Sequence, residues 1–124
     1  MANVMQAAAD VMSTPLVWGE TDCSAAVCSV FHRLYGVDPM RSIRGTYSTP
    51  RGAARIIASY GDLYGLAAWL AAREGLVRGK PREGAIGVND RHLLLCVTPD
   101  LWVAKTRHGL ATCRSAEVSY HVPL

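Results

Sequence analysis

The chain has 124 residues, of which 50% are hydrophobic and only 19% are charged. A typical soluble domain carries about 25% charged residues, so this chain has fewer charged residues than usual. A chain of this length folds as one domain and buries roughly two thirds of its unfolded surface, enough for a core without metal or disulfide staples. The formal net charge of +3 comes from scattered Lys and Arg residues, which argues against nucleic-acid binding. We expect a single domain over residues 1–124.

Targeting and membrane signals are not evident in the sequence. No apolar run approaches the ~20 residues of a membrane helix, so we expect no membrane span. The N-terminus lacks a basic region followed by an apolar stretch and a cleavage site, so we expect no signal peptide and synthesis in the cytoplasm. The four cysteines are then made reduced. Their spacings to the histidines match no standard zinc pair, and we expect neither a metal nor a cofactor.

Four helices are predicted in the first part of the chain. The first is rich in Ala and Met and ends before Pro15, which cannot continue a helix. Thr21 and Asp22 are both good N-caps for the second, whose apolar residues recur at helical spacing, and Gly36 is a natural C-terminal stop. Pro50 suits the first turn of the third helix. The predicted ranges are 2–12, 23–35, 51–59 and 63–73.

The pattern changes after the turn-rich connector 77–83. Short segments that are apolar or alternate between apolar and polar residues follow, separated by turn residues such as Asn, Asp, Gly and Pro. Such segments are typical of antiparallel strands. Helices followed by a strand meander predict an α+β fold, with the N-terminal helices packed on a small antiparallel sheet. The predicted strands are 85–88, 93–97, 101–104 and 118–122.

Cys23 is the candidate nucleophile. It lies in the first turn of a predicted helix, where free backbone N–H groups and the positive end of the helix dipole stabilise a thiolate. The thiolate is the nucleophilic form of cysteine. Cys28 lies five residues further along the helix and points elsewhere, which is typical of an ordinary buried cysteine.

A cysteine nucleophile needs a base, and histidine is the usual one. His32 lies about 13 Å from Cys23 along the same helix and cannot reach it. His92 opens an apolar strand directly after a turn, which places it at the rim of a sheet where the start of a helix could meet it. His108 lies in a turn and His121 near the chain end. Position therefore favours His92 as the base.

The residues around Cys23 resemble the nucleophile region of the NlpC-type peptidoglycan cysteine peptidases, which have a papain-like fold. The resemblance rests on Trp18-Gly19 followed by Asp22-Cys23-Ser24, because an Asp-Cys-Ser stretch opens a helix in that family. It implies that the Cys23 thiolate attacks a peptide carbonyl and that its backbone N–H helps to hold the oxyanion. It also indicates Asp22, Trp18 and Tyr47 as substrate-binding residues.

Two later segments extend the resemblance. The run 84–88 followed by His92-Leu93-Leu94-Leu95 is similar to the strand pair that carries the catalytic histidine of the family. Arg44-Gly45-Thr46-Tyr47 is similar to an element of the small branch encoded in phage tail gene clusters. The third catalytic residue of the family lies on the next strand, which by spacing is near Ala104 or Lys105. His108 could serve if its turn folds back, so the implied catalytic set is Cys23, His92 and His108.

The resemblance implies a phage tail-associated peptidase, located in the virion tail, that hydrolyses amide bonds in the peptides of bacterial peptidoglycan. An alternative from another class is a structural or adaptor protein of the tail tip that keeps the fold but has lost the catalytic residues. Its partners would be tail hub or fibre proteins. A third possibility is an acyl- or peptide-binding protein that uses the same cleft for contact with the host.

Overall fold

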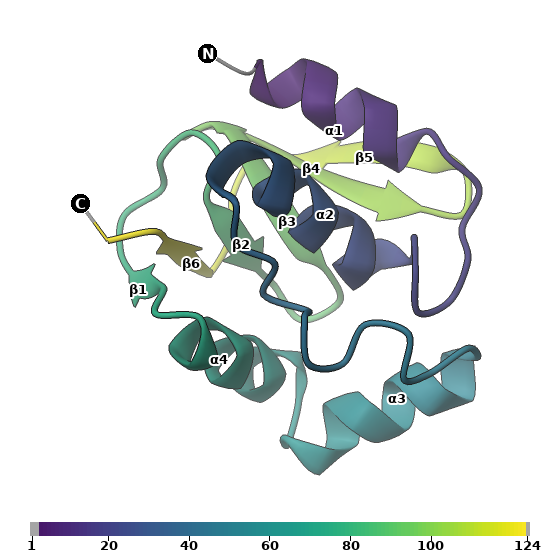
Figure 1. Cartoon of the computed structure of the whole chain (residues 1–124). Coiled ribbons are helices and arrows are strands. Elements are labelled where there is room, and N and C mark those ends of the chain that lie inside the picture. Colours follow the sequence, from purple (N-terminus) through teal and green to yellow (C-terminus); the bar gives the residue numbers. More distant parts are fainter. Residues whose placement is uncertain (1–2, 124) are drawn as a thin grey trace.

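Helices precede strands along the chain, as predicted. The computed structural model describes residues 3–123, and this part of the chain forms four helices and six strands (Figure 1). The helices are α1 (Val4–Met12), α2 (Cys23–Tyr35), α3 (Pro50–Ser59) and α4 (Leu63–Arg73), and the strands are β1 (Val77–Arg78), β2 (Ile86–Val88), β3 (Leu93–Thr98), β4 (Leu101–Thr106), β5 (Gly109–Cys113) and β6 (Val118–His121).

The six strands form one antiparallel sheet in the order β1-β6-β2-β3-β4-β5. Strands β2 to β5 make a meander, and β6 returns to pair with β2 on its other side. The α+β class and the antiparallel sheet are thereby confirmed. Strands β1 and β5 were not predicted, because both are edge strands with few buried residues and therefore lack a clear apolar pattern.

Helices α1, α2 and α4 lie on one face of the sheet (Figure 1). Helix α2 crosses β2, β3 and β4, α1 packs beside it on β3 to β5, and α4 contacts β2. Side chains of alternate strand residues reach this face, among them the fully buried Leu95 and Val103. The intervening residues Leu94 and Cys96 pack on the opposite face around Trp102, which is also fully buried.

Helix α3 is the exception to this packing. None of its residues is buried, and the helix that it contacts is α4 rather than α2 or the sheet. Figure 1 shows it beside α4 and away from the strands. Its Ile56 and Ile57 side chains are half-buried and reach the edge of the main core. The helix therefore covers the space between α4 and the start of α2 without being fixed in the core.

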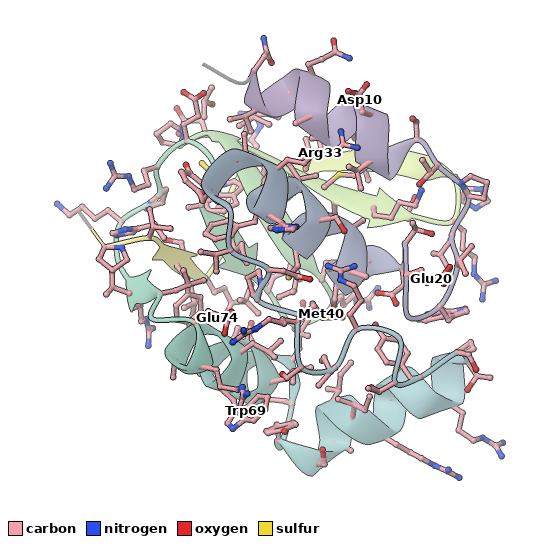
Figure 2. The ribbon with its side chains drawn as sticks, in the orientation of Figure 1. Asp10, Glu20, Arg33, Met40, Trp69 and Glu74 are labelled. Atoms are coloured by element: carbon pink, nitrogen blue, oxygen red, sulfur yellow. The ribbon has the colours of Figure 1, made fainter. Side chains whose placement is uncertain are left out.

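Surface ion pairs connect neighbouring helices and loops. Arg33 of α2 lies 3.8 Å from Asp10 of α1 (Figure 2). Arg41 donates a 3.0 Å hydrogen bond to Glu74 just after α4. All four cysteines are free thiols. Within residues 3–123, no helix has the length and apolar content to cross a membrane, and no His, Cys, Asp and Glu side chains cluster in a way that would hold a metal.

Candidate functional site

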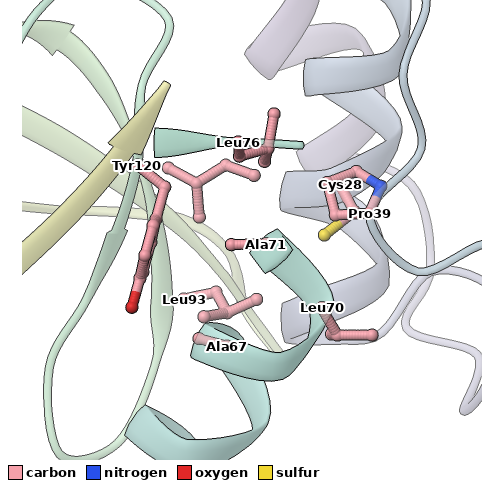
Figure 3. A pocket seen from close by; sticks show the side chains of 9 residues that line it. Cys28, Pro39, Ala67, Leu70, Ala71, Leu76, Leu93 and Tyr120 are labelled. Atoms are coloured by element: carbon pink, nitrogen blue, oxygen red, sulfur yellow. The ribbon is translucent and has the colours of Figure 1, made fainter. Parts of the chain in front are cut away.

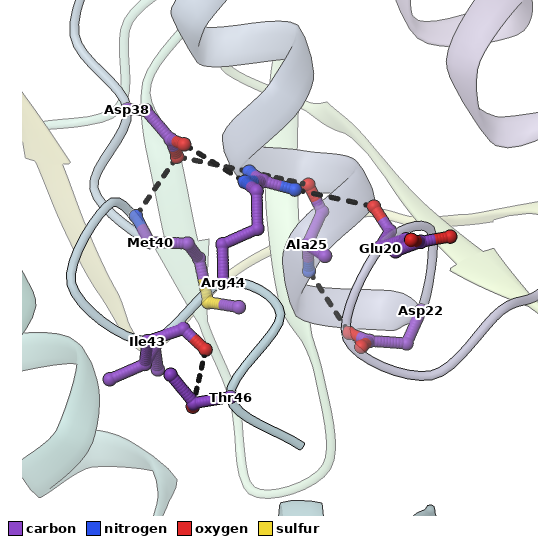
Figure 4. Close-up of polar contacts among 8 residues, drawn as sticks. All are labelled: Glu20, Asp22, Ala25, Asp38, Met40, Ile43, Arg44 and Thr46. Atoms are coloured by element: carbon purple, nitrogen blue, oxygen red, sulfur yellow. Dashed lines mark hydrogen bonds and ion pairs between the residues drawn. The ribbon is translucent and has the colours of Figure 1, made fainter. Parts of the chain in front are cut away.

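The start of α2 is organised by the buried carboxylate of Asp22. Its Oδ1 atom accepts hydrogen bonds from the backbone amides of Ser24 at 3.1 Å and Ala25 at 3.0 Å, as an N-cap does (Figure 4). Its Oδ2 atom accepts from the Gly19 amide at 2.7 Å and the Tyr47 hydroxyl at 2.6 Å. The two carboxylate oxygens thus accept four hydrogen bonds in a side chain that is 2% exposed. Asp22 has no free oxygen for a substrate, which corrects its prediction as a substrate-binding residue.

The Arg44-Gly45-Thr46-Tyr47 element closes the loop 37–49 around this helix start. Arg44 donates two 2.9 Å hydrogen bonds to the two carboxylate oxygens of Asp38 (Figure 4). It also donates to the main-chain carbonyl of Glu20 at 3.2 Å and to that of Ala25 at 3.3 Å. Burial tends to raise the pKa of Asp38, but the hydrogen bonds and charge of Arg44 lower it overall. The arginine is therefore a structural clamp between the loop and α2.

Gly19 allows the two loops to touch. Its φ is +88°, and a Cβ atom there would lie 2.1 Å from the main-chain oxygen of Tyr47. Only glycine fits such a backbone approach without displacing the neighbouring chain. The Gly19 carbonyl also accepts a 3.0 Å hydrogen bond from the Gly45 amide. These contacts hold the segments that carry Trp18 and Tyr47 against each other at the start of α2.

A cavity of about 210 Å³ lies against the first residue of α2. Cys23, Ser24, Trp18 and Tyr47 contribute to one side of it. The other walls are mostly apolar side chains from the loop 37–49, α3 and α4, with Arg91 as the one cationic residue of the lining. The remaining lining residues are Asp22, Met40, Ile43, Pro50, Ala53, Ala54, Ile56, Ile57, Leu63 and Leu66.

A second void lies between α2, α4 and the sheet, lined by residues such as Cys28, Leu70 and Leu93 (Figure 3). It measures about 10 Å³ and its lining presents no polar surface. A cavity needs roughly 10–15 Å³ and polar partners to hold even one water molecule. This void is therefore a packing defect, and burial raises the pKa of the Cys28 thiol beside it. Cys28 is the ordinary buried cysteine that its position predicted.

The Cys23 thiol is half-buried, and its pKa is raised. Burial is the main cause, and the negative charge of Asp22 adds to it. The backbone hydrogen bond at the helix start and the charge of Lys105 act in the opposite direction but do not outweigh them. The helix N-terminus therefore does not lower the pKa of the Cys23 thiol overall, mainly because the thiol is half-buried and also because the charge of Asp22 is close.

No hydrogen bond links Cys23 to His92 or His108, both of which lie among residues 3–123. Neither histidine lines the cavity, and within residues 3–123 no hydrogen bond joins the Cys23 thiol to another group. His92 lies just before β3, in a turn in which Asn89 Oδ1 accepts a 2.8 Å hydrogen bond from the His92 amide. Its neighbour Arg91 lines the cavity instead. His108 is exposed in the β4–β5 turn.

Lys105 occupies the position where the resemblance places a third catalytic residue. It lies two residues after Val103, on the helix-facing side of β4, and is 1% exposed. Its ammonium donates hydrogen bonds to the main-chain carbonyls of Met12, at 2.7 Å, and of Thr14. Burial lowers its pKa. Lys105 therefore satisfies carbonyls at the end of α1, and Ala104 faces the other side of the sheet.

The comparisons with known proteins give a family. The family described as "Domain of unknown function (DUF6950)" has a model that matches residues 2–121. The chain belongs to this family. The match runs from before α1 to the end of β6, so it includes the cavity, the Asp22 network and Lys105. No curated protein and no solved structure matches the chain. The function must therefore be argued from the geometry of the site.

The raised pKa of Cys23 predicts slow alkylation at neutral pH. The rate with iodoacetamide should keep rising above pH 9, because only the thiolate reacts. Asp22→Asn removes the neighbouring charge and should speed the reaction of Cys23 at pH 8 about fivefold, equivalent to roughly 1 kcal/mol of Coulomb energy. Mass spectrometry of the peptides measures the rate, with the half-buried Cys113 in the same sample as the internal control. A plateau for Cys23 near pH 7 would contradict the prediction.

Proposed function

We propose that this chain is a non-catalytic adaptor protein of a phage tail tip that binds a polypeptide segment in the cavity beside Cys23. The observation that carries the proposal is the composition of the cavity. It contains a cysteine with a raised pKa, and none of the histidines among residues 3–123 lines it. A thiol without a nearby base is a poor nucleophile, whereas an apolar cavity with a few polar groups is a typical binding site.

The proposal includes a papain-like fold of the NlpC type. Support comes from the placement of the motifs that carry the resemblance. Trp18-Gly19, Asp22-Cys23-Ser24 and Arg44-Gly45-Thr46-Tyr47 are far apart in the sequence but meet at one end of α2 through hydrogen bonds. A helix that begins with cysteine and packs across an antiparallel sheet agrees with that architecture. The assignment to a phage tail rests on the resemblance of the Arg-Gly-x-Tyr element.

A cysteine peptidase acting on peptidoglycan is the second candidate function. It is favoured by the position of Cys23 as the first residue of the 13-residue helix α2, with its side chain at the cavity. Free backbone N–H groups at such a helix start could hold an oxyanion. The peptidase would require the His92 ring to reach the cavity, which it does not line, from a turn in which Asn89 Oδ1 accepts a 2.8 Å hydrogen bond from the His92 amide.

Digestion of purified peptidoglycan separates the two candidates. The wild type, Cys23→Ala and His92→Ala should all release the same background of soluble fragments, measured by liquid chromatography and mass spectrometry. Fragments that appear with the wild type and vanish with both variants would establish the peptidase and overturn the adaptor.

The adaptor is tested directly by co-expression with phage tail hub and fibre proteins. A stable complex is expected in size-exclusion chromatography. Ala54→Trp should abolish the complex, because Ala54 is exposed on α3 and lines the cavity, so a large side chain there fills the cavity without entering the core. Arg114→Ala, on the exposed β5–β6 connection, is the matched surface control. A complex that tolerates Ala54→Trp would show that the cavity is not the contact.

A further inference from the structure

The polar groups that remain free at the cavity are hydrogen-bond donors. The Asp22 carboxylate, which also borders the cavity, is fully occupied by its four donors. Among residues 3–123, no ion pair or side-chain hydrogen bond engages the Arg91 guanidinium, and the adjacent Asp90 does not pair with it. The Ser24 hydroxyl and the Cys23 thiol are likewise without a partner in this part of the chain. Apart from the Asp22 carboxylate, whose oxygens are fully bonded, the polar groups free at the cavity are thus one cation and two neutral groups that can donate, which suit an anion at Arg91.

The size of the cavity limits what that anion can carry. A cavity of about 150 Å³ lined by aliphatic and aromatic side chains holds one benzene molecule. Sites for drug-sized ligands have about 300–1,000 Å³. The volume of about 210 Å³ here thus suits one large side chain and little more. The walls beside it are apolar, with Ile57 and Leu66 from two different helices, so the side chain that fills it should be apolar too.

Because the cavity takes one side chain and Arg91 lines that same cavity, the anion should lie directly beside the apolar side chain. A C-terminal residue meets this requirement most directly, because its main-chain carboxylate is attached to the Cα atom that bears the side chain. We propose that the cavity binds the C-terminal residue of a partner polypeptide, with a Phe- or Leu-sized side chain among the apolar walls and the terminal carboxylate on Arg91. This inference rests on the proposed binding function and specifies its ligand.

Short labelled peptides test the proposal with the full chain. The probes are fluorescein-labelled hexapeptides of Gly and Ser that end in Phe, Leu or Gly, each as a free acid and as an amide. Binding is measured by fluorescence polarisation. The free acids ending in Phe or Leu should bind at least about tenfold more tightly than their amides, which lack the charge for Arg91. The peptide ending in Gly should lose about tenfold as well, because it leaves the cavity unfilled.

Variants assign the two contacts. Arg91→Ala should bring the acid and the amide within about twofold of each other, while Arg114→Ala should leave the difference unchanged. Ala54→Trp should abolish binding of all peptides. Both Arg91 and Ala54 are exposed, so these variants should fold, which circular dichroism confirms.

The outcomes separate this inference from the proposed function. Equal binding of acids and amides, abolished by Ala54→Trp, would overturn the carboxylate but keep the cavity as a binding site. A hub or fibre complex that Ala54→Trp breaks, with no binding of any peptide, would overturn the C-terminal ligand alone. Failure of both the peptides and the complex would overturn the proposed function together with the inference.

Discussion

Replacing Asp22 with alanine should lower the free energy of unfolding by about 3–4 kcal/mol. The substitution removes the N-cap of α2, which costs about 1 kcal/mol. It also leaves the Gly19 amide and the half-buried Tyr47 hydroxyl without their acceptor, each at the lower end of the roughly 1–3 kcal/mol for a buried group. Domains of this size have total stabilities of about 5–15 kcal/mol. The melting temperature should therefore fall by about 12–15 °C. Urea unfolding and thermal circular dichroism measure both quantities.

Two milder variants test the physical reason. Asp22→Asn keeps an oxygen for the cap and should cost less than half as much. Tyr47→Phe removes only the hydroxyl that donates at 2.6 Å to Asp22 and should cost about 1 kcal/mol. The double variant Asp22→Ala with Tyr47→Phe should lose less unfolding free energy than the two single variants lose in sum, because the two side chains share one hydrogen bond. Full additivity would show that the network seen around α2 does not act as a unit.

Lys105→Ala should be the second severe substitution, with a loss of about 3 kcal/mol. The aliphatic stem of Lys105 is fully buried, so alanine leaves a cavity, and the carbonyls of Met12 and Thr14 lose their donor. Lys105→Met keeps the volume of the stem and should recover part of the loss. It also removes the cost of burying a charge, which can offset a lost hydrogen bond. Equal losses for both variants would show that the stem contributes nothing.

The pH dependence of the Lys105 contribution has a definite sign. Burial lowers its pKa in the folded protein below the ordinary value of 10.5. Between the lowered pKa and 10.5, the unfolded chain binds more protons than the folded one, so the stability contribution of Lys105 rises with pH in that window. The wild type should therefore gain stability relative to Lys105→Met as the pH approaches 10.5. Urea unfolding of both proteins at pH 8 and pH 10 measures the change.

The helices were predictable because their boundaries are local. Helix α2 begins after Asp22 and ends before Gly36, as predicted, since a carboxylate N-cap and a glycine with φ of +73° fix its two ends. Strands β1 and β5 were missed for the opposite reason. An edge strand takes its conformation from the neighbour it pairs with, and its own residues carry little of that signal.

The candidate site was predictable only in part. Trp18, Cys23 and Tyr47 do meet at one cavity, because they flank a helix start whose position the sequence specifies. His92 was harder to place, since Leu93 to Cys96 are all apolar and such a run does not reveal which face each residue occupies. The packing of the two sheet faces decides which side each β3 residue occupies. Arg91, which precedes this strand, lines the cavity. No local pattern marked Arg91 or the walls from α3 and α4.

Helix α3 has ten residues and none of them is buried. Segments with so little buried apolar surface open at a lower free energy than the rest of a domain and exchange their amide hydrogens first. The apolar side of α3 faces the cavity through Ala53, Ile56 and Ile57, so whatever fills the cavity also supplies the helix with the packing it lacks. Occupancy and the order of α3 are then thermodynamically linked, and part of any binding energy is spent on holding this one helix in place.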